Sequence, residues 1–280
     1  MPRPTLSLDA ALTDALAERY LRLLGVAARS PGPEALAEIV AAHVTCVPFE
    51  NVSKLYYRAE PDMRLPPIER YLDGIEHRHF GGTCYANNHH LVRLLAHLGY
   101  DVRLCGADMS APDVHVVGIV RQAGRELLVD VGYGAPFLAP MPLDLTTDHE
   151  IVLGGDRYVL RPRDADGRSR LELHRDGRLR HGYVVNPTAR HIGEFTEVID
   201  RSFEPTAVFM NAVVIARFVP GRSLVLHNRA LIASEGAARE IRRLDDATNL
   251  AEAIEEHFGI PKDIAARALV GVDLTADAWG

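Results

Sequence analysis

The spacing of apolar residues changes at Gly99, and this change limits the possible folds more than any other feature of the chain. Before it, residues 9–25 and the segment that begins near Pro33 carry apolar side chains three or four positions apart, which predicts amphipathic helices. We expect Asp9 to cap the first helix and Gly25 to end it. After Gly99, short runs rich in β-branched residues predict strands at 102–105, 114–120, 126–131, 151–153 and 158–160. The N-terminal third is therefore predicted to be helical and the middle third to form a sheet or barrel.

The rest of the chain adds a hairpin and a mixed C-terminal third. Residues 171–175 and 178–183 are joined by Asp176-Gly177, the residue types that a type I′ hairpin turn requires. Beyond this hairpin the patterns predict helices near 193–201 and 250–258. Between these helices they predict strands near 213–217, 223–226 and 230–233. Since no internal repeat or low-complexity linker separates the parts, we expect them to pack as one body.

Composition and charge narrow the range of partners. With 47% hydrophobic and 25% charged residues, the chain has the composition of an ordinary folded protein. Its 31 Lys and Arg against 38 Asp and Glu give a net charge of -7, which would repel a polyanion, so nucleic acid is not an expected partner. The chain starts without the apolar core of a signal peptide, and its longest nearly apolar run, 207–216, is about half the ~20 residues that cross a bilayer. We therefore expect a cytoplasmic protein without a membrane span.

Cys84 is the cysteine whose surroundings favour chemistry. It follows Gly81-Gly82 and opens a segment of helical spacing that ends at Gly99. Unpaired backbone N–H groups at the start of a helix favour an anion, and the anionic thiolate is the nucleophilic form of cysteine. A small core residue at a helix start fits the same segment, so a partner base is needed to decide. Cys46 and Cys105 have no visible partner and are interpreted as core thiols.

Two polar residues in the following apolar runs are candidates for that partner, His115 and Asp130. If the two runs pair as a hairpin with a two-residue loop at Gln122-Ala123, His115 lies opposite Asp130. A four-residue loop keeps both on one face of the sheet, whereas a three-residue loop separates them. Taken singly, each residue is more often structural. Together with Cys84 they describe a nucleophile, a base and an orienting carboxylate.

Four motifs follow one another in an order that a known enzyme family shares. They are Pro48-Phe49-Glu50-Asn51, Gly81-Gly82-Thr83-Cys84, His115 ahead of a β run, and Val129-Asp130-Val131-Gly132-Tyr133-Gly134. With these motifs the chain resembles the arylamine N-acetyltransferases over nearly its whole length. The resemblance implies an α+β fold with a helical bundle at 1–97, a β-barrel at 98–192 and an α/β lid at 193–280. It also implies a triad like that of cysteine proteases, on Cys84, His115 and Asp130.

The family further implies an activity and a substrate site. An acetyl group from acetyl-CoA would pass through a Cys84 thioester to an arylamine, arylhydrazine or similar amine, in a ping-pong reaction. His115 would take the proton from the amine, and Asp130 would hold the imidazole. The acceptor is expected to meet three residues that follow the aspartate, Tyr133, Ala135 and Phe137. Gly132 and Gly134 would let the backbone approach the cofactor, or would only turn the chain.

Three departures from the family pattern bear on the substrates. Phe80 stands where the family has an arginine, Ala86 replaces a frequent Glu or Gln, and Ala207 replaces a frequent serine. In the family, this arginine is expected to pair with the region around Glu50. Without it, a buried Glu50 carboxylate would lack a cation, which is costly in free energy. We therefore expect Glu50 to reach water or to be paired by one of four nearby cationic side chains, Lys54, Arg58, Arg78 or His79.

Alternatives from other classes remain open at this point. The same triad could serve an amide synthase of natural-product assembly, a cysteine hydrolase that gives the acyl group to water, or a binding protein without catalysis. No histidine pair has a carboxylate or cysteine at ligand spacing, so no metal site is predicted. The expected partners are a small amine and acyl-CoA, and nothing in the sequence indicates an oligomeric state.

Overall fold

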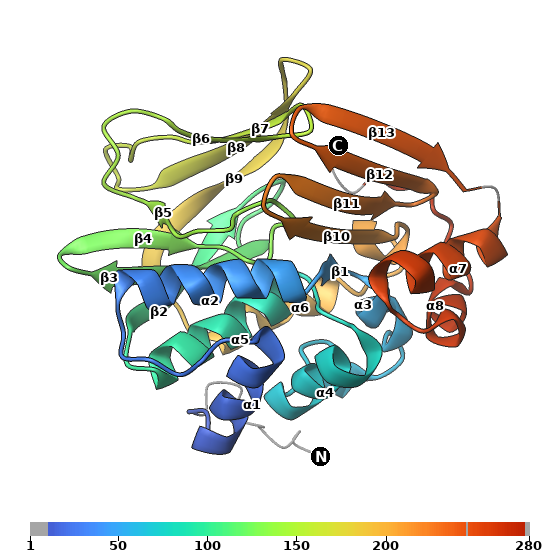
Figure 1. Cartoon of the computed structure of the whole chain (residues 1–280), viewed down its shortest axis with the longest axis horizontal. Helices are drawn as coiled ribbons and strands as arrows, with labels where there is room; N and C mark the ends of the chain where they lie inside the picture. Colours follow the sequence, from blue (N-terminus) through green and yellow to red (C-terminus); the bar gives the residue numbers. More distant parts are fainter. Residues whose placement is uncertain (1–10, 245, 278–280) are drawn as a thin grey trace.

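Helices make up most of the N-terminal third of the chain, as predicted. The structure, a computed structural model, describes residues 11–244 and 246–277 (Figure 1). The helices in this part are α1 Asp14–Leu24, α2 Pro33–Cys46, α3 Val52–Tyr56, α4 Ile68–Arg78 and α5 Cys84–His97, with a 3₁₀ turn η1 at Pro61–Met63. The apolar spacing did not predict the short helix α3 or the longer helix α4. Both lie between α2 and α5 along the chain.

The ends of the first two helices follow from local capping. Thr13 accepts a hydrogen bond from the backbone N–H of Leu16, so α1 begins at Asp14 rather than near residue 9. Asp9 lies outside the described residues. Gly25 ends α1 in the left-handed conformation, with φ of 71°, and Pro33 is the first residue of α2, both as predicted.

An antiparallel sheet of eight strands follows and curls into a nearly closed barrel. Its strands lie in the order β5, β4, β3, β2, β9, β8, β7, β6. Their bounds are β2 Asp101–Asp108, β3 His115–Gln122, β4 Arg125–Val129, β5 Met141–Pro142, β6 His149–Leu153, β7 Asp156–Leu160, β8 Ser169–Arg175 and β9 Arg178–Ala189. The predicted β-rich middle third is confirmed.

Two hairpins of this sheet test the turn predictions. In the hairpin of β8 and β9, Arg175 pairs with Arg178, and both Asp176 and Gly177 have positive φ, which confirms the predicted turn. In the hairpin of β3 and β4 the turn residues are Ala123-Gly124, not Gln122-Ala123, because Gln122 pairs with Arg125. The loop still has two residues, so the parity that keeps His115 and Asp130 on one face is retained.

A second antiparallel sheet has the strand order β1, β10, β11, β12, β13 and joins a strand of the N-terminal third to four strands of the C-terminal third. Its strands are β1 Phe49–Glu50, β10 Val214–Val219, β11 Arg222–His227, β12 Ala230–Glu235 and β13 Ala238–Arg243. The remaining helical elements are η2 Ile192–Phe195, α6 Thr196–Arg201, η3 Val208–Met210, α7 Ala247–Phe258 and α8 Lys262–Leu269. Since β1 comes from the helical third, the predicted boundaries after residues 97 and 192 do not coincide with the ends of this sheet, and they stay a prediction.

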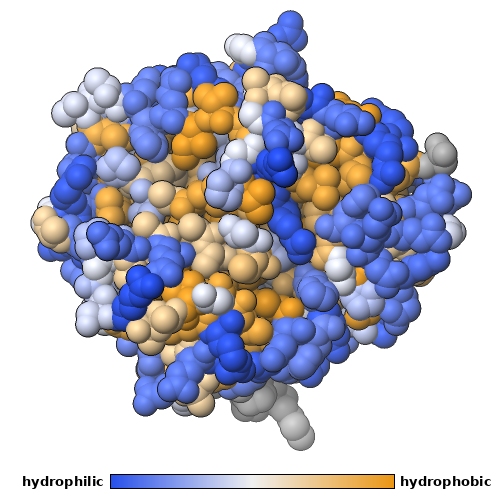
Figure 2. Space-filling model, viewed as in Figure 1, coloured by the Kyte–Doolittle hydropathy of each residue, from blue (hydrophilic) through white to orange (hydrophobic). Residues whose placement is uncertain are grey.

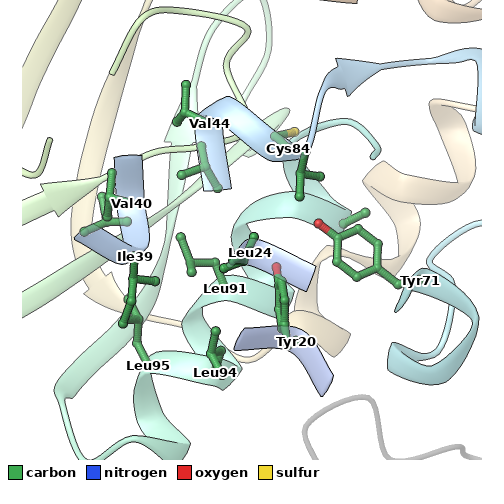
Figure 3. Packing of buried hydrophobic residues seen from close by; sticks show 14 of the residues in the cluster. Tyr20, Leu24, Ile39, Val40, Val44, Tyr71, Cys84, Leu91, Leu94 and Leu95 are labelled. Atoms are coloured by element: carbon green, nitrogen blue, oxygen red, sulfur yellow. The ribbon is translucent and has the colours of Figure 1, made fainter. Parts of the chain in front are cut away.

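Apolar packing fixes the position of α5. Its Leu91, Leu94 and Leu95 are fully buried against α1 and α2, and Figure 3 shows Cys84 at the edge of this cluster. A separate cluster fills the barrel, and a third joins α3, α7 and α8 to the five-stranded sheet. On the face seen in Figure 2, apolar side chains gather across the middle and hydrophilic ones surround them. The helix that begins at Cys84 therefore lies within the apolar core.

Candidate active site

Two glycines allow the chain to pass closely in front of Cys84. A Cβ at Gly81 would lie 1.9 Å from the carbonyl oxygen of Pro48, and one at Gly82 would lie 2.8 Å from the Cβ of Ala86. The Glu50 N–H donates to the Gly82 carbonyl at 3.1 Å. A side chain is therefore excluded at Gly81 by the segment that leads into β1, and at Gly82 by the first turn of α5. Cys84 follows as the first residue of α5, where backbone N–H groups are unpaired.

The structure brings together the three residues predicted to carry the chemistry. His115 is the first residue of β3 and Asp130 directly follows β4, so the hairpin places both side chains beside the start of α5. His115 Nε2 lies 2.9 Å from Asp130 Oδ2, and both residues are buried. Cys84 lies close enough to the same imidazole ring to contribute to the raised pKa of His115. Its Sγ also lies 3.8 Å from the carbonyl oxygen of Val114.

Asp130 is held as a carboxylate by four donors. Besides His115, the Tyr183 hydroxyl donates to Oδ2 at 2.8 Å, and Oδ1 accepts from Asn88 Nδ2 at 2.8 Å and from the Gly132 N–H at 3.0 Å. Burial by itself would raise the pKa of Asp130, but His115 and the hydrogen bonds from Asn88 and Gly132 outweigh burial and lower this pKa. The carboxylate is therefore ionised and fixed in orientation.

Asn88 and Tyr183 were not predicted from the local pattern of the chain. Asn88 lies one helical turn after Cys84 on α5, and its side chain also donates to the Val116 carbonyl at 2.6 Å and accepts from the Val131 N–H at 2.8 Å. It thereby ties α5 to both strands of the hairpin. The i, i+4 spacing from Cys84 is the one signal that places Asn88 on the same helix face. Tyr183 carries no local signal, because its contact depends on the sheet order.

The charge on His115 follows from its two neighbours. Burial disfavours the imidazolium, but the Asp130 carboxylate and Cys84 outweigh burial and raise the pKa of His115 to about 10. Its proton is therefore retained as pH rises past the ordinary histidine range near ~6.5. The imidazolium thus places a positive charge beside Cys84.

We expect His115 to be an imidazolium at pH 8 in the resting enzyme, and ring ¹⁵N chemical shifts of histidine-labelled protein measure this. His43 and His181 provide internal references, because burial lowers their pKa values to about 3 and about 4 and keeps both rings neutral. In Asp130→Asn the imidazolium signal should disappear, because the charge that stabilises it is lost. A neutral His115 ring at pH 8 in the wild type would contradict the ion pair.

Gly132 has a structural role at the point where the hairpin meets α5. A Cβ there would lie 2.6 Å from Cys84 Cα and 2.7 Å from Asn88 Nδ2. We expect Gly132→Ala to lower the free energy of unfolding by ~1–3 kcal/mol and to reduce activity, because α5 and the hairpin must move apart. Urea unfolding and initial rates measure both effects. Gly193→Ala is the matched control, since a Cβ at Gly193 meets nothing within 4 Å, and an equal loss in both variants would refute this role.

The residues predicted to contact substrate are not all at a cavity. Tyr133 and Gly134 line a cavity of about 240 Å³ between the barrel and the five-stranded sheet. Ala135 and Phe137 are buried in the barrel core, where the Phe137 ring stacks on that of Tyr133 at 5.9 Å. The Tyr133 ring lies 5.6 Å from the His115 ring, and its hydroxyl is 2.5 Å from His181 Nδ1. Tyr133 thus connects the cavity to the catalytic candidates.

Glu50 is fully buried and is satisfied without a cation, so neither expected outcome, a substitute cation or exposure to water, is found. Its carboxyl group accepts from the Ser53 N–H at 2.8 Å, the Ser53 hydroxyl at 2.5 Å and the Gly81 N–H at 3.1 Å. Burial raises the pKa of Glu50, which favours its neutral form. Phe80 is buried against the rings of Tyr56 and Tyr57, at 6.0 and 6.1 Å. Three of the predicted cations, Lys54, Arg58 and Arg78, donate hydrogen bonds to groups other than Glu50.

Ala86 and Ala207, the other two departures from the family pattern, take different positions. Ala86 is buried next to Gly82, where its methyl group fits the tight turn. Ala207 precedes the η3 turn, and the next residue but one, Phe209, packs its ring edge on Phe49 at 6.0 Å.

Within residues 11–244 and 246–277, no three His, Cys, Asp or Glu side chains are grouped so that they could hold a metal ion. In the same part of the chain, no helix has the length and apolar character needed to cross a membrane.

Comparison with known proteins identifies the family of this chain. A family model described as N-acetyltransferase matches residues 34–267. The arylamine N-acetyltransferase of Mycolicibacterium smegmatis is 28% identical over 265 residues, which cover 89% of this chain and 93% of that protein. The chain therefore belongs to the arylamine N-acetyltransferase family and is an acyltransferase.

Solved structures share the fold. The arylamine N-acetyltransferase from Mycobacterium abscessus superposes with a TM-score of 0.79 at 19% identity, over 96% of this chain and 99% of that one. The enzyme of Mycobacterium marinum in complex with CoA superposes with a TM-score of 0.75 at 24% identity, over 93% of this chain and 100% of that one. The mixed α/β architecture and the curled sheet are therefore those of the family.

Proposed function

We propose that this enzyme transfers an acetyl group from acetyl-CoA to an arylamine, an arylhydrazine or a similar amine, in a ping-pong reaction through a thioester on Cys84. One observation carries the proposal. Cys84 lies close enough to His115 to raise the pKa of its ring, and the Nε2 atom of that ring lies 2.9 Å from the buried Asp130 carboxylate. A thiol, an imidazole and an orienting acid in this order are the parts that nucleophilic acyl transfer requires.

In the first half-reaction the Cys84 thiolate attacks the thioester carbonyl of acetyl-CoA. The new C–S bond forms as the bond to the coenzyme sulfur breaks, and the departing CoA thiolate takes the proton from the His115 imidazolium. Unpaired N–H groups at the start of α5 are suited to stabilising the negative charge that develops on the carbonyl oxygen. The step leaves an acetyl thioester on Cys84 and a neutral His115.

In the second half-reaction the amine attacks this thioester. His115, now neutral, accepts the proton that the amine nitrogen loses, and Cys84 leaves as the thiolate. Asp130 stabilises the imidazolium that forms again, because it accepts its hydrogen bond at 2.9 Å. The ion pair is thus restored for the next cycle, and no other reactant is consumed.

The donor assignment is supported by the family, one of whose members was solved in complex with CoA. For the acceptor we propose the cavity beside Tyr133. Its walls combine aromatic and apolar residues with charged ones: Tyr133, Tyr158, Leu173, Phe218, Asp156 and Arg175. Arg175 holds Asp156 through two hydrogen bonds, of 2.5 and 2.6 Å. We therefore propose an acceptor with an aryl ring and a polar substituent.

Incubation with acetyl-CoA and a panel of arylamines and arylhydrazines tests this function. Formation of the acetylated amine with matching release of CoA is the expected result. Free acetate without amide would instead identify a cysteine hydrolase, and an amide formed only with another acyl thioester would identify an amide synthase. If neither acyl-enzyme nor product forms, the transferase function is refuted.

A further inference from the structure

A second cavity, of about 40 Å³, lies beside the turn that precedes Cys84. We propose that this cavity binds a carboxylate at the far end of the acyl group carried by Cys84, so that the enzyme accepts dicarboxylic acyl donors of the malonyl class. The inference rests on the proposed Cys84 thioester. Three cationic side chains line the cavity, Lys54, Arg64 and Arg70, and none of its described lining residues is an aspartate or a glutamate.

Lys54 is the central cation of this cavity. It projects from α3, and its ammonium group donates to the Ser202 hydroxyl at 2.6 Å and lies 4.1 Å from the centre of the Phe203 ring. Among the described residues no carboxylate pairs with it. Burial and the charge of Arg64 lower the pKa of Lys54 to about 7, although Cys84 acts in the opposite direction. A half-buried ammonium with only a neutral hydroxyl partner retains donor capacity for an anion.

Arg64 adds a second set of donors. Its Nη1 lies 2.6 Å from Asp200, whereas its Nε is buried and has no hydrogen-bond partner within the described part of the chain. Lys54 and Arg64 are close enough to repel each other, and the Asp200 carboxylate pairs with Arg64 alone. An anion placed between them would relieve this repulsion and satisfy Nε.

The position and size of the cavity favour an acyl carboxylate over a larger anion. Gly82, Thr83 and Tyr85 form part of its wall, so it adjoins Cys84 along the chain, and Cys84 lies within electrostatic reach of Lys54. Its volume of about 40 Å³ exceeds the ~10–15 Å³ needed by one water-sized group but is too small for a nucleotide. The buried ring of Phe80 supplies an apolar wall. A short acyl chain that ends in a carboxylate matches this combination.

The test compares four donors with wild type and Lys54→Met: acetyl-CoA, malonyl-CoA and the acetyl and malonyl thioesters of pantetheine, which lack the nucleotide phosphates. Acyl-enzyme formation is followed by intact mass, and kcat/KM by amide production. We expect the wild type to accept malonyl donors. In Lys54→Met the ratio of malonyl to acetyl kcat/KM should fall at least tenfold, with the CoA donors and the pantetheine donors alike. Lys54→Arg, which keeps the cation, should retain most of this ratio.

Lys262→Met is the matched control, because Lys262 is an exposed lysine that pairs with Glu252 at 2.7 Å, and its ratio should stay at the wild-type value. Equal losses with both CoA donors and none with the pantetheine thioesters would assign the cavity to a phosphate of CoA and overturn the proposal. An unchanged ratio in Lys54→Met would also overturn it. If the wild type takes acetyl but not malonyl groups, this inference fails alone, whereas failure with acetyl-CoA as well refutes the proposed function.

Discussion

Acyl transfer by Cys84→Ser is expected to fall ~10⁴-fold or more below the wild-type rate. A serine hydroxyl at the start of α5 stays protonated beside His115, whereas the thiol in the same place can form the anion that attacks the donor. Amide production from acetyl-CoA and an arylamine, compared at equal enzyme concentration, measures the loss. The fold should persist, because serine is close to cysteine in size.

The other two cysteines provide the controls for this variant. Cys46 is exposed, so the prediction that it is a core thiol is wrong. Cys105 is buried in the barrel as predicted, and burial raises its pKa to about 11. Cys46→Ser should keep wild-type activity. If Cys84→Ser retains more than ~1% of the rate while its fold is intact, the sulfur of Cys84 is not the nucleophile.

Asp130→Asn is expected to lower kcat by ~10⁴-fold, the size of effect that loss of the orienting carboxylate has in a nucleophile, histidine and aspartate arrangement. The amide keeps the shape of the side chain but removes the charge that raises the pKa of His115. It also allows the imidazole to adopt the wrong tautomer. The rate of Cys84 acylation by acetyl-CoA, followed by rapid quenching and mass measurement, reports this change directly.

Tyr183→Phe is the graded comparison for Asp130→Asn. It removes one donor to Asp130 Oδ2, and the hydrogen bonds from His115, Asn88 and the Gly132 N–H remain. A loss of roughly 10- to 150-fold, well below that of Asp130→Asn, is expected, because a single hydrogen bond to a charged group contributes ~1.5–3 kcal/mol. Equal effects of the two variants, or an Asp130→Asn rate within tenfold of wild type, would mean that Asp130 does not set the charge of His115.

Much of the fold follows from local patterns in the sequence. The remaining parts could not be predicted, because they depend on contacts between residues that are distant in sequence. The Asp176-Gly177 turn and the Gly25 helix end were predictable because each needs positive φ. In contrast, β1 is a two-residue strand, too short to show any periodicity, and its pairing with β10 joins residues far apart in sequence. The five-stranded sheet therefore crosses the boundary that the sequence suggested.

The site shows the same division. His115 and Asp130 were found because polar residues inside apolar runs stand out, and the even loop between their strands keeps them on one face. The turn was displaced by one residue, since Gly124 as well as Ala123 takes positive φ. Tyr183 could not be found, because its place beside Asp130 depends on β9 lying next to β2.

Glu50 illustrates how a family pattern can mislead. The missing arginine suggested a substitute cation, but two backbone N–H groups and the Ser53 hydroxyl satisfy the carboxyl group. Lys54, one of the four predicted substitutes, instead lines a cavity together with Arg64. The sequence shows that Lys54 is near Glu50 along the chain. It does not show whether the Lys54 side chain points toward Glu50 or into the cavity.

Intact-mass spectrometry of the enzyme mixed with acetyl-CoA in the absence of amine tests the central claim most directly. We expect a species heavier by one acetyl group, located on Cys84 by peptide mapping, absent from Cys84→Ser and discharged when an arylamine is added. An acetyl group on another residue, or amide production at full rate with no acyl-enzyme at any time, would contradict it.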